Sequence, residues 1–253
     1  MTIWVLLRGL MRESRHWGEF PIRFKEAVAC EAVVPLDFPG NGRLHHLKSP
    51  SRVTEMVDSV RAQLLDLGHL PPYCVLAQSL GAMVSVAWNE RFPGEIEKLV
   101  LINTSLAPFN PFYHRLRPEN YPGLIWTMLF GSMANRERLI LDVTSNLRRL
   151  ENGQTVLMQW IGYSVQAPVA RKNILRQLLA AATFRAKVNK PSIPVLLLAS
   201  EHDRLVDVKC SHALAKFWDC PILMHPAAGH DLPLDDAEWV LHQCVQWQPR
   251  RNR

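Results

Sequence analysis

The sequence lacks any apolar run of the length that a membrane crossing requires, which is about 20 residues. Its first apolar stretch, residues 3–7, is interrupted by Arg8 and is too short even for the apolar part of a signal peptide. Charged residues make up 21% of the chain and hydrophobic residues 48%, so neither disorder nor a membrane-embedded fold is expected. These absences predict a globular domain without a membrane span.

Cysteine is scarce. The 253 residues include five scattered cysteines and no Cys-x-x-Cys pair, which favours a reduced, cytoplasmic chain over a disulfide-stabilised secreted one. His45 and His46 are adjacent, but no acidic or cysteine partners stand at ligand spacing. We therefore expect no metal and no other cofactor.

The positive charge is unevenly distributed along the chain, whose net charge is +6. Residues 107–187 contain eleven Lys or Arg and four Asp or Glu, whereas the rest contains 18 basic and 19 acidic residues. The middle third would therefore attract an anionic partner. No nucleic-acid-binding motif accompanies the charge, so nucleic acid is not the expected partner.

Strand patterns alternate with helical patterns, and there is no internal repeat. The predicted strands cover residues 2–7, 31–36, 74–77, 99–102, 193–200 and 222–225. Helices are predicted at residues 17–29, 53–67, 211–217 and 235–247 and directly after Ser79, with serines before Val53 as a possible cap. This alternation predicts an α/β fold with a mostly parallel sheet covered by helices on both faces.

Ser79 stands at the centre of a strand–turn–helix pattern. An apolar strand leads into Ala77-Gln-Ser-Leu-Gly81, and a helical pattern follows. A nucleophile elbow needs small residues two positions before and two after its serine, because the strand and helix backbones nearly touch there. The same residues also fit an ordinary strand followed by a helix-capping serine. The motif alone does not decide between the two.

Two downstream loops supply an acid and a base. Asp203 follows a strand, and His230 precedes the final helix. A serine hydroxyl needs a base to accept its proton, and the base needs an acid to hold its tautomer. The chain order Ser79, Asp203, His230 is that of α/β hydrolases. Asp207 is a weaker alternative acid, since it suits a helix cap, and His225 lies in a predicted strand.

On these motifs the chain resembles the α/β-hydrolase superfamily over essentially its whole length. The layout is similar to small bacterial carboxylesterases of the pimeloyl-acyl-carrier-protein methyl ester esterase type, and to related C–C bond hydrolases and enol-lactonases. The turn Asp37-Phe-Pro-Gly-Asn-Gly42 resembles the family's Asp-x-Pro-Gly-x-Gly turn and is interpreted as structural.

The resemblance implies an oxyanion hole made by the backbone N–H groups of Leu10 and Leu80. The chain departs from the family at two positions: Ala77 replaces the first glycine of Gly-x-Ser-x-Gly, and Arg8 replaces the histidine of the usual His-Gly. Alanine is still small, and backbone donors do not depend on side-chain identity. Arg8 nevertheless leaves the shape and polarity of the oxyanion loop open.

The resemblance also divides the chain into a core, residues 1–106 and 188–253, and a helical lid, residues 107–187. Apolar stretches of the lid would line an acyl pocket or simply pack the lid onto the core. The candidate pocket residues are Trp17, Trp126, Phe130 and Trp160. The basic lid suits an acidic acyl carrier protein, which the resembling esterases use.

The sequence thus predicts a serine hydrolase that cleaves a small-molecule carboxylic ester with a medium-length acyl group, free or bound to a carrier protein. Thioesterase, lactonase or C–C bond hydrolase activity would use the same residues, because the pocket selects the substrate. A non-catalytic binding protein on a hydrolase scaffold is the alternative of another class. Such proteins usually lose a triad residue, whereas all three candidates are present here.

Overall fold

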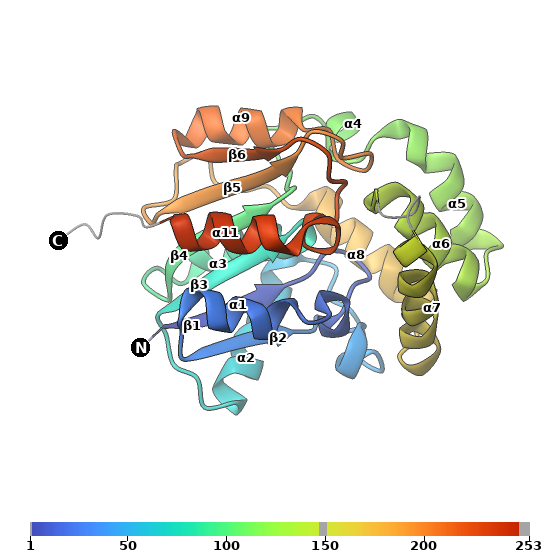
Figure 1. Ribbon diagram of the computed structural model, residues 1–253, viewed down its shortest axis with the longest axis horizontal. Helices are drawn as coiled ribbons and strands as arrows, with labels where there is room; N and C mark the ends of the chain where they lie inside the picture. The colour runs from blue at the N-terminus through green and yellow to red at the C-terminus, as the bar shows by residue number, and fades with distance from the viewer. Residues whose placement is uncertain (1, 147–150, 248–253) are drawn as a thin grey trace.

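Six parallel strands form one sheet in the computed structural model, which describes residues 2–146 and 151–247 (Figure 1). The strand order is β2-β1-β3-β4-β5-β6. In chain order the strands are β1 Ile3–Leu7, β2 Ala32–Leu36, β3 Tyr73–Gln78, β4 Ile96–Ile102, β5 Val195–Ser200 and β6 Ile222–His225. Because every neighbouring pair is parallel, the carboxyl ends of all the strands lie at one edge.

Helices cover both faces of this sheet. Those that flank it are α1 Phe20–Val28, α2 Val53–Asp66, α3 Leu80–Arg91, α9 Lys209–Trp218, α10 Leu232–Asp235 and α11 Ala237–Gln246. Short 3-10 turns, η1 and η2, lie at Ser14–Trp17 and Gly42–Leu44. Helices α1 and α11 pack side by side in front of the sheet in Figure 1. The expected α/β architecture is confirmed.

The core consists of two apolar layers, one on each face. Successive strand residues point to opposite faces, so Val5 joins one layer and Leu6 the other. The first layer includes the apolar side of α2 and the almost fully buried α3, and the second includes residues of α1 and α11. Strands β1, β3 and β5 are buried throughout, which explains their continuous apolar runs.

A helical segment separates β4 from β5. It contains α4 Phe112–Arg115, the 3-10 turn η3 Pro118–Asn120, α5 Tyr121–Leu129, α6 Met133–Thr144, α7 Glu151–Gln166 and α8 Arg171–Thr183. Helices α5, α6 and α7 lie together to one side of the sheet in Figure 1. The segment leaves and re-enters the core side by side, because Ala107 and Arg185 form a parallel bridge.

This inserted segment, residues 107–187, has a small apolar cluster of its own. Leu141 of α6 packs with Leu157 and Trp160 of α7, and Leu234 of α10 joins them from the core. The division into core and lid stays a prediction. None of the helices in the described parts of the chain has the length and apolarity to cross a membrane.

The predicted secondary structure is wrong at several element boundaries and at the cap of α2. The helix expected at residues 17–29 begins only at Phe20, because Gly18 adopts φ 55° and ends the preceding turn. The last helix is divided at Asp236, which caps α11 by accepting from the N–H of Trp239. No serine caps α2: its N-cap is Arg52, and the Ser49 hydroxyl donates to the carbonyl of Pro39 at 2.6 Å.

Candidate active site

Ser79 lies in the sharp turn between β3 and α3. Its backbone has φ 52° and ψ −114°, an unfavourable conformation for a residue with a side chain, costing on the order of 1–3 kcal/mol. The turn is held by a hydrogen bond from the N–H of Ser79 to the carbonyl of Ile102 at 3.0 Å. The side chain is only half-buried, unlike those of β3 before it. This is the geometry that a nucleophile elbow requires.

Two glycines allow the loop after β1 to approach this turn. A Cβ on Gly81 would lie 2.5 Å from the carbonyl oxygen of Leu7 and 2.7 Å from that of Arg8, which is too close for any atom. A Cβ on Gly9 would lie 3.3 Å from the Cβ of Ser79. The loop that was predicted to supply an oxyanion donor therefore lies directly against Ser79.

The amides around Ser79 differ in whether they already have acceptors. The N–H of Met11 donates to Gln177 Oε1 at 2.9 Å, and that of Arg12 donates to the carbonyl of Gly9. The N–H groups of Leu10 and Leu80 have no protein acceptor within the described parts of the chain. Among the described residues, no other protein group therefore uses these two predicted donors. Their role as an oxyanion hole stays a prediction.

Asp203 and His230 are brought together from the loops after β5 and β6. His230 Nδ1 lies 2.7 Å from Asp203 Oδ2, and both side chains are almost fully buried. The other carboxylate oxygen accepts from the N–H groups of Leu205 and Val206 at 2.8 and 2.9 Å. A carboxylate held in this way accepts from Nδ1–H, which leaves Nε2 of His230 to accept a proton.

Asn103 was missed as a site residue, although it directly follows an apolar strand at the expected edge. It adopts φ 45° after β4, and its Nδ2 donates to the carbonyl of His230 at 2.9 Å and to Ser200 Oγ at 3.0 Å. Gln78 Nε2 donates to the same carbonyl of His230 at 2.9 Å. The residue before Ser79 and the residue after β4 therefore both hold the loop that carries His230, residues 226–231, which we call the histidine loop.

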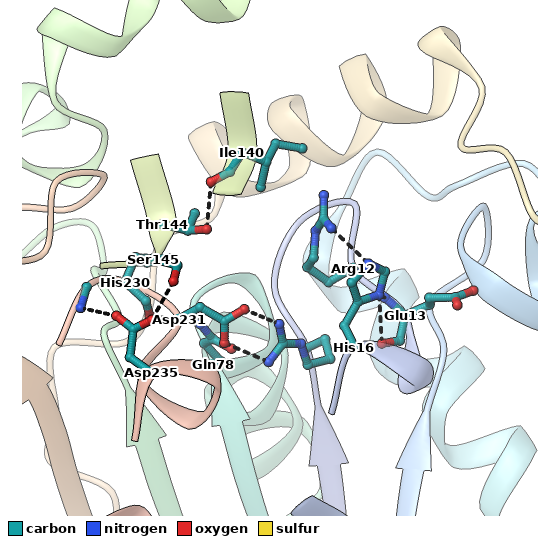
Figure 2. A network of polar contacts seen from close by, with 12 residues as sticks. Arg12, Glu13, His16, Gln78, Ile140, Thr144, Ser145, His230, Asp231 and Asp235 are labelled. Carbon is teal, nitrogen blue, oxygen red and sulfur yellow. Dashed lines mark hydrogen bonds and ion pairs between the residues drawn. The ribbon is translucent and has the colours of Figure 1, made fainter. Parts of the chain in front are cut away.

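Arg8 forms a buried ion pair with Asp231, the residue after His230. Its two terminal nitrogens bind the two carboxylate oxygens at 3.0 and 2.5 Å, and the dashed lines at Asp231 in Figure 2 mark these bonds. The guanidinium also lies over the Trp17 ring, 4.7 Å from its centre. The side chain of Arg8 therefore links the loop after β1 to the loop that carries His230.

The end of α6 meets the same histidine loop (Figure 2). The N–H of Asp231 donates to the carbonyl of Thr144 at 2.7 Å. Asp235 accepts from Ser145 Oγ at 2.5 Å and from the N–H of Gly229 at 2.6 Å. Burial raises the pKa of Asp235, while these hydrogen bonds act to lower it. The inserted segment is therefore anchored beside His230.

A second buried cluster anchors α6 to the loop after β1. Arg12 donates to Glu137 Oε2 at 2.8 Å and lies over the ring of Trp160, 4.6 Å from its centre. Arg12 also donates to His16 Nε2 at 2.8 Å, and His16 Nδ1 lies 3.1 Å from the backbone nitrogen of Glu13. Burial holds the pKa of His16 well below 6.5, and the charge of Arg12 lowers it further. The lowered pKa favours the neutral form of this buried ring, which Figure 2 shows beside Arg12 and Glu13.

The four candidate pocket residues do not share one environment. Trp17 and Trp160 are buried against Arg8 and Arg12, whereas Trp126 and Phe130 are 53% and 72% exposed. A groove of about 780 Å³ opens beside β2, and Ser79, Asp203 and His230 do not line it. The assignment of an acyl pocket to these four residues stays a prediction.

The alternative acid and base have structural partners. Asp207 accepts from the N–H of Lys209 at the start of α9. His225 Nδ1 accepts from the N–H of Ala228 at 2.8 Å, and its Nε2 lies 3.1 Å from Asp236. No group of three or more metal-ligating side chains is found in the described residues, and the ring of His45 is bonded to the carbonyl of Gly42.

A parallel sheet with a serine at the turn after β3, and a bonded acid and histidine after its last two strands, defines a protein of the α/β-hydrolase class. The sequence agrees: residues 4–243 match the alpha/beta hydrolase family, and the chain belongs to that family. Membership supports hydrolase activity. No curated protein matches the sequence.

Solved structures share the fold at low sequence identity. An esterase from Thermogutta terrifontis superposes with a TM-score of 0.77 at 17% identity, over 98% of this chain and 89% of that one. An enol-lactonase from Burkholderia xenovorans superposes with a TM-score of 0.79 at 18% identity, over 96% of this chain and 90% of that one. A 2-hydroxy-6-oxo-6-phenylhexa-2,4-dienoate hydrolase from a Rhodococcus species superposes with a TM-score of 0.77 at 15% identity, over 97% of this chain and 89% of that one. These similarities establish the fold.

Proposed function

We propose that this protein is a serine hydrolase that cleaves carboxylic esters through Ser79, His230 and Asp203. The observation that carries the proposal is the strained Ser79 turn at the same sheet edge as a buried His230–Asp203 pair. Ser79 Oγ attacks the ester carbonyl carbon while His230 Nε2 accepts the hydroxyl proton. Asp203 stabilises the resulting imidazolium and fixes its orientation.

The acyl-enzyme then forms and breaks in two balanced steps. The tetrahedral intermediate collapses, the C–O bond to the alcohol breaks, and the alcohol leaves with the proton from His230. Water then attacks the acyl carbon and gives a proton to His230. The bond between the acyl carbon and Ser79 Oγ breaks, His230 returns the proton to Oγ, and the acid leaves. The N–H groups of Leu10 and Leu80 stabilise the oxyanion in both steps, and one such donor contributes about 10²–10³ in rate.

The substrate proposed is a medium-length apolar acyl ester. The inserted segment would act as a lid, because α6 is anchored to the oxyanion loop through Glu137 and to the histidine loop through Thr144. The fold neighbours include an esterase, an enol-lactonase and a C–C bond hydrolase, so thioester, lactone and C–C bond substrates belong in the same assay panel.

The test is labelling by a fluorophosphonate probe together with turnover of p-nitrophenyl esters of increasing chain length. We expect Ser79→Ala to abolish both. The buried Ser211 on α9 offers a matched control, and Ser211→Ala should leave both unchanged. Labelling retained in Ser79→Ala would refute the assignment. A folded wild-type protein that neither labels nor turns over any substrate class would indicate a binding protein on this scaffold.

We further propose that the basic inserted segment binds an acidic acyl carrier protein that presents the ester. The support is the excess of seven positive charges in residues 107–187. A carrier-bound methyl ester should then be hydrolysed faster than the free ester, and this advantage should shrink as salt increases. Replacing the exposed Lys172 of α8 by Glu should weaken this preference for the carrier-bound ester, and replacing the exposed Lys216 of α9 by Glu should not. Equal rates for the carrier-bound and free esters, unchanged by salt, would refute the proposed binding of a carrier protein.

A further inference from the structure

The ion pair of Arg8 and Asp231 connects the two loops that carry the proposed oxyanion donor and the proposed base. Arg8 directly precedes Gly9, on which a Cβ would lie 3.3 Å from the Cβ of Ser79, and Asp231 directly follows His230. The two residues are 223 positions apart in the chain, and their side chains are 1% and 3% exposed. Both terminal nitrogens of Arg8 are bound to the carboxylate of Asp231. The two bonds fix the orientation of the guanidinium relative to the carboxylate as well as the distance between them.

Stability alone does not account for such a pair. Two charges removed from water lose their hydration, and an apolar pair of similar volume is often as stable or more so. A bidentate contact does supply geometry that an apolar contact cannot, because it holds the guanidinium and carboxylate planes together. Asp231 is the residue next to His230, so the geometry of the pair bears on the position of the proposed base.

The other bonds to the histidine loop come from different directions. Gln78 and Asn103 hold the carbonyl of His230 from the ends of β3 and β4, and Thr144 holds the N–H of Asp231 from α6. Arg8 adds the connection to β1, the strand that leads into the oxyanion loop. Without Arg8, the histidine loop would keep its other bonds but lose its direct link to the loop that holds Leu10.

We propose that Arg8 and Asp231 form a positioning pair, which sets the His230 ring relative to Ser79 and the Leu10 amide and neutralises the carboxylate next to His230. The inference rests on the proposed function and deepens it. Neither residue touches the reacting atoms; both act through the two loops that they join. A displacement of about 1 Å in such a loop lowers a rate by up to about 10²-fold.

The pair also has an electrostatic consequence for the protonated histidine. The charged groups bonded to His230 or to its loop come from several elements: Asp203 after β5, Asp231 with its partner Arg8 after β1, and Asp235 in α10. Removing Arg8 alone leaves a carboxylate that favours the imidazolium. Neutralising Asp231 alone leaves a cation that disfavours it.

The experiment compares Arg8→Met, Asp231→Asn and the double variant in the full-length protein. We expect kcat for a p-nitrophenyl ester to fall about 10–100-fold in each single variant, with KM changed less than about threefold. The acid limb of the pH–rate profile should move to higher pH in Arg8→Met and to lower pH in Asp231→Asn. The double variant should restore the position of the limb but not kcat, because the charges balance while the link is absent.

Folding is controlled by circular dichroism, thermal unfolding and a matched ion pair far from Ser79. Arg61 and Glu95 are also bidentate, at 2.8 and 2.7 Å, and Arg61→Met should lower stability without altering kcat or the pH profile. If one single variant does not fold, the other single variant and the double variant still test the proposal.

Wild-type kcat in the folded variants, or acid limbs that move in the same direction, would overturn the positioning pair. A wild-type protein that fluorophosphonate does not label would instead overturn the proposed function.

Discussion

Gly81→Ala is expected to disturb both the fold and the catalytic rate. The added Cβ would lie 2.5 Å from the carbonyl oxygen of Leu7 and 2.7 Å from that of Arg8. Both are backbone atoms of a buried strand end, so neither can move aside as a flexible side chain would. Relieving the overlap requires α3 and the loop after β1 to separate by several tenths of an ångström.

We expect a loss of about 1–3 kcal/mol in the free energy of unfolding, the usual effect of overpacking a closely packed site. For a chain of this size each kcal/mol corresponds to about 2–4 °C in Tm. The same separation moves the Leu10 amide away from Ser79. The rate kcat should therefore fall by about 10-fold or more while KM changes little, since an oxyanion donor acts in the transition state.

The assays are urea unfolding and steady-state turnover, with Gly162→Ala as the control. Gly162 lies inside α7, and a Cβ there would meet no atom within 4 Å. This variant should be more stable than the wild type by about 0.5–1 kcal/mol, because alanine is the better helix former. The close approach of Gly81 would be refuted if Gly81→Ala matched the wild type in both stability and kcat.

Three further predictions concern individual groups. Asp203→Asn should lower kcat by about 10⁴-fold in a folded protein, since an amide favours the wrong tautomer of His230; a near-normal kcat would exclude Asp203 as the acid. The hydrogen bond from Arg61 holds the pKa of Glu95 below 4.5, so the ionised carboxylate stabilises the fold above that pH, and this contribution is lost as pH falls through the lowered pKa. Glu95→Gln should therefore cost about 1–2 kcal/mol at neutral pH and almost nothing in acid, and an equal cost in urea unfolding at both pH values would contradict this. Burial raises the pKa values of Cys210 and Cys244 to about 12, so both thiols should resist a disulfide reagent in the native protein and react once it is denatured; labelling of the native protein, mapped by mass spectrometry, would disagree.

The strands and helices could be predicted where their patterns are local. The strand at residues 222–225 is confirmed with the same bounds, and α2 ends within one residue of the prediction. Strand β4 begins three residues earlier than predicted. Glu97 and Lys98 interrupt its apolar run, but the backbone of this stretch pairs with β3. Pairing between strands, which a local pattern does not contain, decides such boundaries.

The candidate site could be predicted in part. Ser79, Asp203 and His230 each follow a recognisable strand or loop, so their residue types and order were visible in the sequence. The structure adds the hydrogen bond between Asp203 and His230. Trp126 and Phe130 show the opposite case: their apolar character suggested a pocket, yet both lie mostly exposed on the inserted segment. An apolar residue type does not specify which surface covers it.

By itself, the sequence determined the alternation of strands and helices, the small residues around Ser79 and the family to which the chain belongs, because these depend on residue types at short spacing. Only the tertiary structure decided that Arg8 binds Asp231, that Asn103 holds the carbonyl of His230 and that α6 is anchored through Glu137 and Thr144. These contacts join residues far apart in the chain. They exist because the parallel sheet brings the carboxyl ends of β1, β4, β5 and β6 to one edge.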